Sequence, residues 1–193
     1  MTSTVWRVAA ASIVGSSHER RGQPCQDRHR WVRSSQGWLV AAVADGAGSA
    51  CLGEVGAEVA TRTVVETVRQ EVEAAGLVLG RDEAQWRGLL MLGLRAARDA
   101  VVAEAAARGA DPRDLATTLL LVAATPDLVA AAQVGDGAVV LNDHHGVLRA
   151  LTVPKVGEYI NETVFLTSPT ALVQAQTAVW EGASTHLAAF SDG

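Results

Sequence analysis

Two long helical patterns between two groups of strand-like segments constrain the possible folds of this chain most. Apolar residues recur at three- and four-residue steps through residues 52–75 and again through residues 83–108, as on the buried face of an amphipathic helix. Asp82 is a good N-cap for the second helix, and Gly109 is a suitable C-terminal stop. The short link between them predicts an antiparallel pair of helices packed on a sheet.

Apolar runs of strand length lie on both sides of the helix pair. We expect strands at residues 4–14, 28–32 and 38–44, and then at residues 116–124, 128–134, 138–142, 147–151, 171–179 and 185–190. The order of strands, helices and strands is typical of an α+β fold and not of βαβ alternation. No repeat or linker divides the chain, so we expect one domain over residues 1–193, a β-sandwich covered by helices.

The composition limits the kinds of partner and compartment. The net charge is −5 and the basic residues are scattered, whereas a nucleic-acid interface needs a broad basic face. No apolar run free of charge reaches the roughly 18 residues of a membrane span. Two cysteines make no disulfide framework. We therefore expect a cytoplasmic protein that binds neither nucleic acid nor membrane. Local basic clusters near acidic residues favour an anionic substrate.

Three of the apolar runs end at an Asp-Gly pair. These pairs are Asp45-Gly46, Asp136-Gly137 and Asp192-Gly193. One such pair alone is more often an ordinary turn. Three at similar strand ends can gather carboxylates at one edge of a sheet, and carboxylates gather at short range around a cation. Carboxylate and carbonyl oxygens suit Mg²⁺ or Mn²⁺, so the pattern indicates a metal site.

At this point the motifs resemble those of a known family. The chain is similar to the metal-dependent protein serine/threonine phosphatases (the PPM, or type 2C, family), and to the bacterial branch with histidine in its opening motif. The resemblance spans almost the whole chain and is carried by GSSH with PCQD (15–18, 24–27), VADGAGS (43–49), ATTLLL (116–121), VGDGAV (134–139), GEYINETVFL (157–166) and FSDG (190–193). It implies a four-layer αββα sandwich, in which two mainly antiparallel sheets are flanked by helix pairs.

The resemblance also implies a two-metal site for Mn²⁺ or Mg²⁺. Asp45 is expected to bridge the two metals, the carbonyl of Gly46 to bind the second and Asp192 the first. Asp136 is expected to lie close by and to hold a looser third metal. The implied reaction is hydrolysis of phosphoserine and phosphothreonine on proteins by a metal-activated water. The implied partner is a phosphorylated protein, in opposition to a serine/threonine kinase.

Other residues of the motifs receive supporting roles, and two of them depart from the family pattern. Asp27 is expected to hydrogen-bond a water on the metal. His18 stands where the family often has an arginine that holds the substrate phosphate, so phosphate binding is expected to depend on pH. Gln26 stands where many members have a glutamate, and the neutral amide is expected to weaken the second metal. Thr117 and Thr118 are interpreted as strand packing without a chemical role.

The last departure is at the end of the sequence. The family continues with further strands and another metal-ligating aspartate, whereas this sequence stops at Gly193. We therefore expect a C-terminally incomplete domain with weak metal binding and low activity.

Two alternative functions stay open at this stage. The first is a phosphatase-fold protein of little or no activity that binds or senses a phosphorylated partner, which Gln26 and the short tail favour. The second is nucleotide binding between the strand and the helix that flank residues 46–53. Its glycine spacing is GxGxxxxG and not GxGxxG, and no GxxxxGK[ST] motif occurs, so this alternative has little support.

Overall fold

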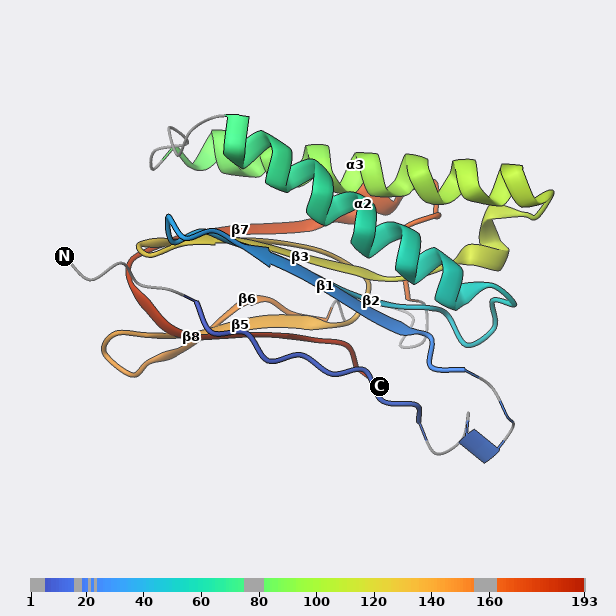
Figure 1. Ribbon diagram of the computed structural model, residues 1–193, viewed down its shortest axis with the longest axis horizontal. Helices are drawn as coiled ribbons and strands as arrows, with labels where there is room; N and C mark the ends of the chain where they lie inside the picture. The colour runs from blue at the N-terminus through green and yellow to red at the C-terminus, as the bar shows by residue number, and fades with distance from the viewer. Residues whose placement is uncertain are drawn as a thin grey trace.

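The structure is a computed structural model that describes residues 6–15, 19–20, 22, 24–74, 82–154 and 163–192. In these ranges the chain forms two antiparallel sheets and a pair of long helices, stacked in layers (Figure 1). The helices cover the outer face of the larger sheet, and the smaller sheet packs on its inner face. The predicted α+β class with two antiparallel sheets is confirmed.

The larger sheet has five strands in the order β1-β2-β3-β4-β7. They are β1 (Asp27–Arg33), β2 (Leu39–Asp45), β3 (Leu119–Thr125), β4 (Leu128–Val134) and β7 (Gln176–Glu181). Every neighbouring pair is antiparallel. The two central strands β3 and β4 are buried along almost their whole length, which is why they read as continuous apolar runs.

The smaller sheet has three strands in the order β6-β5-β8. They are β5 (Ala138–Asp143), β6 (Leu148–Thr152) and β8 (Ser184–Phe190). Side chains from the facing surfaces of the two sheets form a second hydrophobic core, with Val122, Val129, Val139 and Leu141 each at most 1% exposed. The burial of these side chains stacks the two sheets.

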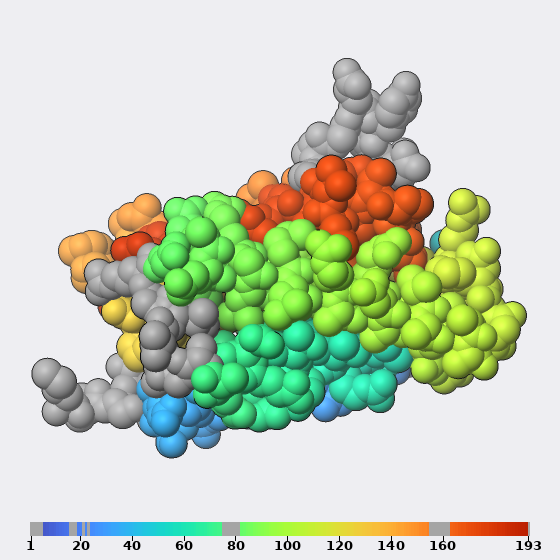
Figure 2. Space-filling view, turned by 90° about the horizontal axis from the view of Figure 1, so that it is seen from above, coloured from blue at the N-terminus to red at the C-terminus, as the bar shows by residue number. Residues whose placement is uncertain are grey.

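The helix pair consists of α2 (Gly53–Ala74) and α3 (Glu83–Arg108), which run side by side across one face of the molecule (Figure 2). The predicted bounds of α3 are confirmed. The carboxylate of Asp82 accepts from the backbone N–H of Ala84, and Gly109 ends the helix with a left-handed φ of 67°. Close packing of the helices depends on Gly93, where a Cβ would lie 2.8 Å from the Cγ2 of Val68.

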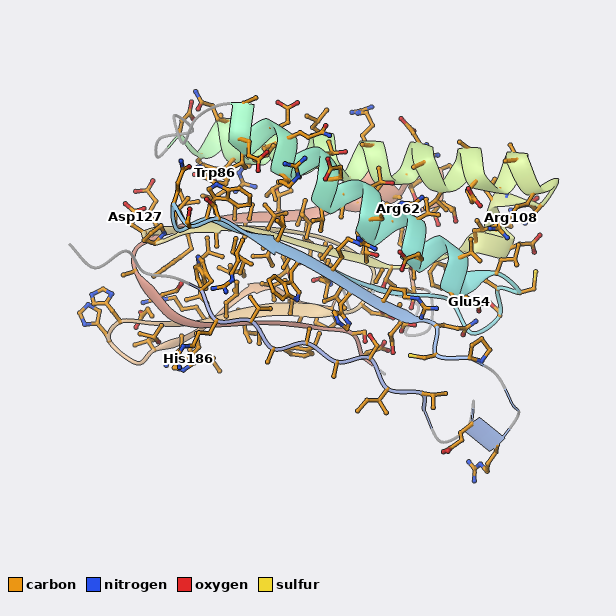
Figure 3. The ribbon with its side chains drawn as sticks, viewed as in Figure 1. Glu54, Arg62, Trp86, Arg108, Asp127 and His186 are labelled. Atoms are coloured by element: carbon orange, nitrogen blue, oxygen red, sulfur yellow. The ribbon has the colours of Figure 1, made fainter. Side chains whose placement is uncertain are left out.

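The helices meet the larger sheet through the main hydrophobic core. Trp86 lies under α3 toward this sheet and is 3% exposed (Figure 3). Two shorter helical segments, η1 (Pro112–Leu115) and α4 (Ala171–Gln174), both contact α3. Among the residues described, no second pair of long helices covers the smaller sheet. None of the described helices is both long and apolar enough to span a lipid bilayer.

The first predicted strand is wrong in its described part, since residues 6–15 form no strand. Trp6 packs against the core between the sheets, and its indole N–H donates to the carbonyl oxygen of Gly37. Farther along, Ile13 is 79% exposed. A cavity of about 770 Å³ lies between this segment, the larger sheet and β8. The apolar composition therefore reflects core contacts at one end of the segment and not a strand ladder.

The strand predicted at residues 171–179 is partly wrong. Its first four residues form the single helical turn α4, which buries Ala171. The strand β7 begins only at Gln176 and forms an edge of the larger sheet. A turn that buries one or two residues shows the same short-range alternation as an edge strand, so the pattern alone did not separate the two.

One helix contact supports the chain just before the candidate site. Gly56 of α2 touches η1 so closely that a Cβ would lie 2.1 Å from the carbonyl oxygen of Leu115. Leu115 immediately precedes the segment that pairs with the end of β2. An alanine at residue 56 would therefore push α2 away from η1.

We expect Gly56→Ala to lower the free energy of unfolding by about 1–3 kcal/mol, the usual cost of overpacking. The matched control is Gly88→Ala in α3, where a Cβ meets nothing within 4 Å. This control should gain about 0.5–1 kcal/mol because alanine is the better helix former. Urea denaturation of both variants measures the difference. Equal effects of the two substitutions would contradict the contact.

Candidate metal centre

The candidate site begins where β2 ends, at Asp45. The backbone N–H of Asp45 donates to the hydroxyl of Thr118 (3.0 Å), and its carbonyl accepts from the N–H of Thr118 (2.8 Å) and the hydroxyl of Thr117 (2.9 Å). Both threonines are buried. Three hydrogen bonds therefore hold the backbone of Asp45 and leave its half-buried carboxylate to face the space beyond the strand.

The next residue, Gly46, turns the chain toward α2. Its N–H donates to the carbonyl of Gln26 (3.2 Å), and it forms an isolated antiparallel bridge with Thr117. A Cβ on Gly46 would lie 2.4 Å from the carbonyl carbon of Gly53, the first residue of α2. Only glycine permits this close approach of two backbones, so the Asp-Gly pair has a steric reason as well as a chemical one.

Asp27 lies directly across the sheet from Asp45. The two residues are antiparallel partners at the end of the β1–β2 ladder. The hydroxyl of Ser191, which follows β8, donates to Asp27 Oδ1 at 3.3 Å. The Cys25 thiol lies 4.0 Å from Asp27 Oδ2. Asp27 therefore connects the start of the larger sheet to the end of the smaller one.

Asp136 occupies the tight turn between β4 and β5. Gly135, just before it, has a φ of 112°, which favours glycine. Gly137, just after it, packs so closely that a Cβ would lie 2.6 Å from the carbonyl oxygen of Phe190. The hydroxyl of Thr163 donates to Asp136 Oδ2 at 2.5 Å. The turn is therefore fixed against β8 and against the segment at Thr163.

Asp192 reaches the same end of the molecule from the C-terminal strand. Phe190, the last residue of β8, pairs with Ala138, the first residue of β5. Asp192 lies two residues after Phe190, and Asp136 lies two residues before Ala138. Because the two strands are antiparallel, both aspartates lie at the same end of this strand pair. Figure 1 places the end of β8 near the starts of β1 and α2. Glu54 marks this end in Figure 3, whereas Asp127 lies at the opposite end.

The charges of the other three aspartates act on Asp45. Burial, followed by the charges of Asp27, Asp192 and Asp136 in this order, together raises the pKa of Asp45 from its ordinary value of 3.8 to about 7. All three carboxylates are therefore near enough to Asp45 to disfavour its charged form. Metal binding by residues 45, 136 and 192 stays a prediction.

The donor set suits a hard divalent cation. It consists of carboxylate oxygens with the carbonyl of Gly46 beside them, which are the ligands that Mg²⁺ and Mn²⁺ prefer. The raised pKa of Asp45 reflects its burial first and then the nearby negative charges, which such a cation would offset. Within the described ranges, no three His, Cys, Asp or Glu side chains are arranged to hold a metal ion as they stand.

Two other residues with predicted roles are His18 and Gln26, and only Gln26 is among the residues that the structure describes. The Gln26 side-chain amide donates to the carbonyl of Ala50 at 3.4 Å. Its amide nitrogen also lies 3.2 Å from the position of a Cβ on Gly53. Gln26 therefore contacts the loop that follows Asp45.

The sequence interpretation missed the residues that hold the site. Thr117 and Thr118 were interpreted as strand packing, but they bind the backbone of Asp45. Gln133 was not singled out, although its buried side chain binds the turn that carries Asp136. Polar residues inside apolar runs were the available signal, because a buried polar group needs hydrogen-bond partners.

Comparison with known proteins identifies the family. The profile of the protein phosphatase 2C family matches residues 14–193. Serine/threonine-protein phosphatase 3 of Escherichia coli (strain K12) is 36% identical over 192 residues, which are 97% of this chain and 73% of that protein. Together with the α+β sandwich and its acidic end, these matches assign the chain to the protein serine/threonine phosphatases. The chain belongs to the protein phosphatase 2C family.

Solved structures show the same fold. A bacterial serine phosphatase superposes with a TM-score of 0.63 at 14% identity, over 86% of this chain and 72% of the other. RsbX in complex with magnesium superposes with a TM-score of 0.51 at 15% identity, over 83% of this chain and 62% of the other. At such low identity these similarities concern the arrangement of sheets and helices.

The repulsion around Asp45 predicts a stability gain when its charge is removed. The folded pKa of about 7 exceeds the ordinary value of 3.8, so the folded state holds the proton more tightly than the unfolded state. The wild-type protein therefore loses stability as pH rises from about 4 to above 7. We expect metal-free Asp45→Asn to unfold at a higher temperature than wild type at pH 8, by about 2–4 °C for each kcal/mol of repulsion removed.

Thermal denaturation in EDTA at several pH values measures this effect. The gain should shrink as the pH falls and vanish below the ordinary pKa of 3.8, where Asp45 is protonated in both states. The control is Asp99→Asn, on the exposed surface of α3, which should show no such pH-dependent gain. An Asp45→Asn variant less stable than wild type at pH 8 would contradict the crowding of charges.

Proposed function

We propose that this protein hydrolyses phosphoserine and phosphothreonine on proteins, with Mn²⁺ or Mg²⁺ bound at the acidic end of the two sheets. The observation that supports this most is the raised pKa of Asp45, which burial and the charges of three aspartates from separate strand ends bring about together. The family and the E. coli relative support the reaction class. The magnesium complex of RsbX supports the kind of ion.

The proposed ligands are those that the resemblance to the family implies. Asp45 would bridge two cations, the carbonyl of Gly46 would bind the second, and Asp192 would bind the first. Asp136 would hold a third and looser cation. Asp45 and Gly46 are both held by hydrogen bonds to neighbouring segments, so little backbone ordering is needed when the cations bind.

In the reaction the water oxygen bonds to phosphorus, the bond from phosphorus to the serine or threonine oxygen breaks, and a proton of the water passes to that oxygen, which leaves the free hydroxyl and inorganic phosphate. Cations held by these residues would lower the pKa of the attacking water and offset charge on the phosphoryl group. Asp27 would accept a hydrogen bond from that water and orient it. Ser191 donates to Asp27 and so limits its rotation. His18 is proposed to hold the substrate phosphate, most strongly when it is protonated.

The proposed partner is a phosphorylated protein, in opposition to a serine/threonine kinase. The proposed location is the cytoplasm, and the proposed unit of function is one domain over residues 1–193. The alternative is a protein of the same fold that binds a phosphorylated partner with little turnover. Gln26, which donates to the carbonyl of Ala50, favours this alternative. The resemblance implies a glutamate at this position in many family members, whereas the glutamine amide carries no charge.

The test compares wild type with Asp45→Asn on p-nitrophenyl phosphate and on a phosphothreonine peptide, with Mn²⁺ present. We expect kcat/KM to fall at least about 100-fold in Asp45→Asn, because loss of a bridging carboxylate removes several kcal/mol of transition-state stabilisation. Asp99→Asn, a surface aspartate of α3, is the matched control and should match wild type.

Two outcomes would change the proposal. Hydrolysis by Asp45→Asn at the wild-type rate would reject the site. Absence of hydrolysis by wild type, together with tight binding of the phosphopeptide in a fluorescence titration, would support the sensing alternative in place of the enzyme.

A further inference from the structure

One buried polar side chain has no place in the chemistry proposed above. Gln133 lies in β4, three residues before Asp136, and is 1% exposed. Glutamine is seldom buried so completely, because its amide must then find partners inside the protein. The neighbours of Gln133 in β4 are Ala132 and Val134, so a solely structural sheet position would favour an apolar residue here.

The partners of Gln133 surround Asp136. Its Nε2 donates to the carbonyl oxygen of Gly137 at 2.7 Å and to that of Gly135 at 2.9 Å. A longer contact of 3.4 Å reaches the carbonyl of Val153. The two short bonds therefore join the residues immediately before and after Asp136 to a single side chain.

The orientation of the amide is unambiguous. All three neighbours of Nε2 are carbonyl oxygens, so exchanging the amide oxygen and nitrogen would place an oxygen against three acceptors. Oε1 is buried and has no hydrogen-bond partner. A buried acceptor without a partner destabilises the folded state. The amide is therefore placed for its donor group, and its acceptor is left without a partner.

The turn needs such a donor because its own backbone cannot supply one. Gly135 has a φ of 112° and Gly137 is buried against Phe190. Both flanking carbonyls point to Gln133 rather than into a sheet ladder. Without the amide these carbonyls would lack that partner, and a turn of two glycines and one aspartate has little side-chain packing to keep its shape.

We propose that Gln133 is a positioning residue that fixes the Asp136 turn, so that the Asp136 carboxylate faces Asp45 and contributes to cation binding. This inference rests on the proposed function. Gln133 touches neither the substrate nor the cations, and acts only through the backbone of residues 135–137. Thr163 binds the carboxylate of Asp136 itself, so the backbone and the side chain of Asp136 are held by different residues.

A matched control stands on the next strand. Gln176 of β7 is the cross-strand partner of Gln133. Its Nε2 donates to the same carbonyl of Val153 at 2.7 Å, and its Oε1 accepts from the N–H of Val153 at 3.4 Å. Gln176 thus shares with Gln133 its residue type, its strand register and its contact with Val153. Among the described residues, the hydrogen bonds of the Gln176 side chain go to Val153 and not to Gly135 or Gly137, so Gln176 separates the two roles.

The experiment measures Mn²⁺ binding by wild type, Gln133→Met and Gln176→Met without substrate, by electron paramagnetic resonance of the free ion. Methionine keeps the length of the side chain and removes the donor. We expect Gln133→Met to weaken binding about tenfold or more, as is usual when a group that orients a metal ligand is lost. Gln176→Met should bind as wild type does. The Mn²⁺ concentration for half-maximal hydrolysis should shift in parallel.

Mn²⁺ binding by folded Gln133→Met with wild-type affinity would overturn the inference, as would an equal loss in both methionine variants. If Gln133→Met does not fold, Gln133→Asn decides by the same criterion, since it keeps the amide but shortens its reach by one methylene. Asp45→Asn separates this inference from the proposed function. Unchanged Mn²⁺ binding in Asp45→Asn rejects the metal site itself, whereas its loss together with wild-type binding by Gln133→Met rejects only the role of Gln133.

Discussion

Mutual repulsion among four aspartates is the constraint on which this end of the molecule depends. Asp27, Asp136 and Asp192 together raise the pKa of Asp45, in addition to the effect of burial. Like charges at short range destabilise a fold unless their backbones are firmly held. The surrounding structure provides such support mainly through hydrogen bonds to the backbone, which leave the carboxylates available for a ligand.

Three of the four aspartates are each held in a different way, and each of the three has a contact from a segment distant in sequence. Asp45 is held by the threonines at the start of β3. Asp27 is held by its ladder position opposite Asp45 and by Ser191. Asp136 is held by Gln133 and Thr163. The site is therefore assembled only when both sheets are stacked, which links its formation to the core between them.

The helices and most strands were predictable because their signals are local. Asp82 and Gly109 bound α3 as predicted, since a cap and a left-handed stop act within one turn. The candidate ligands could be named from the sequence, because Asp-Gly after an apolar run is visible there, and their role stays a prediction. The supporting residues could not be named in this way. Thr118 lies 73 residues from Asp45, and no local pattern reports a hydrogen bond over that separation.

The errors have the same origin. Apolar residues 6–15 looked like a strand, but pairing is a property of two segments and a single segment does not encode it. Helix α4 was mistaken for the start of β7 because one turn is too short to display a helical period. The second helix pair, implied by resemblance, is absent from the part of the chain that the structure describes.

With a pKa of Asp45 near neutrality, protons and the proposed divalent cations would compete for the same two carboxylate oxygens. Cation binding would release a proton whenever the solution is more acidic than this pKa, so the two equilibria would be linked. For one competing proton, the apparent affinity for the cation would fall by about tenfold for each unit of pH below it. Small changes of pH around neutrality lie within the range over which this aspartate changes its charge.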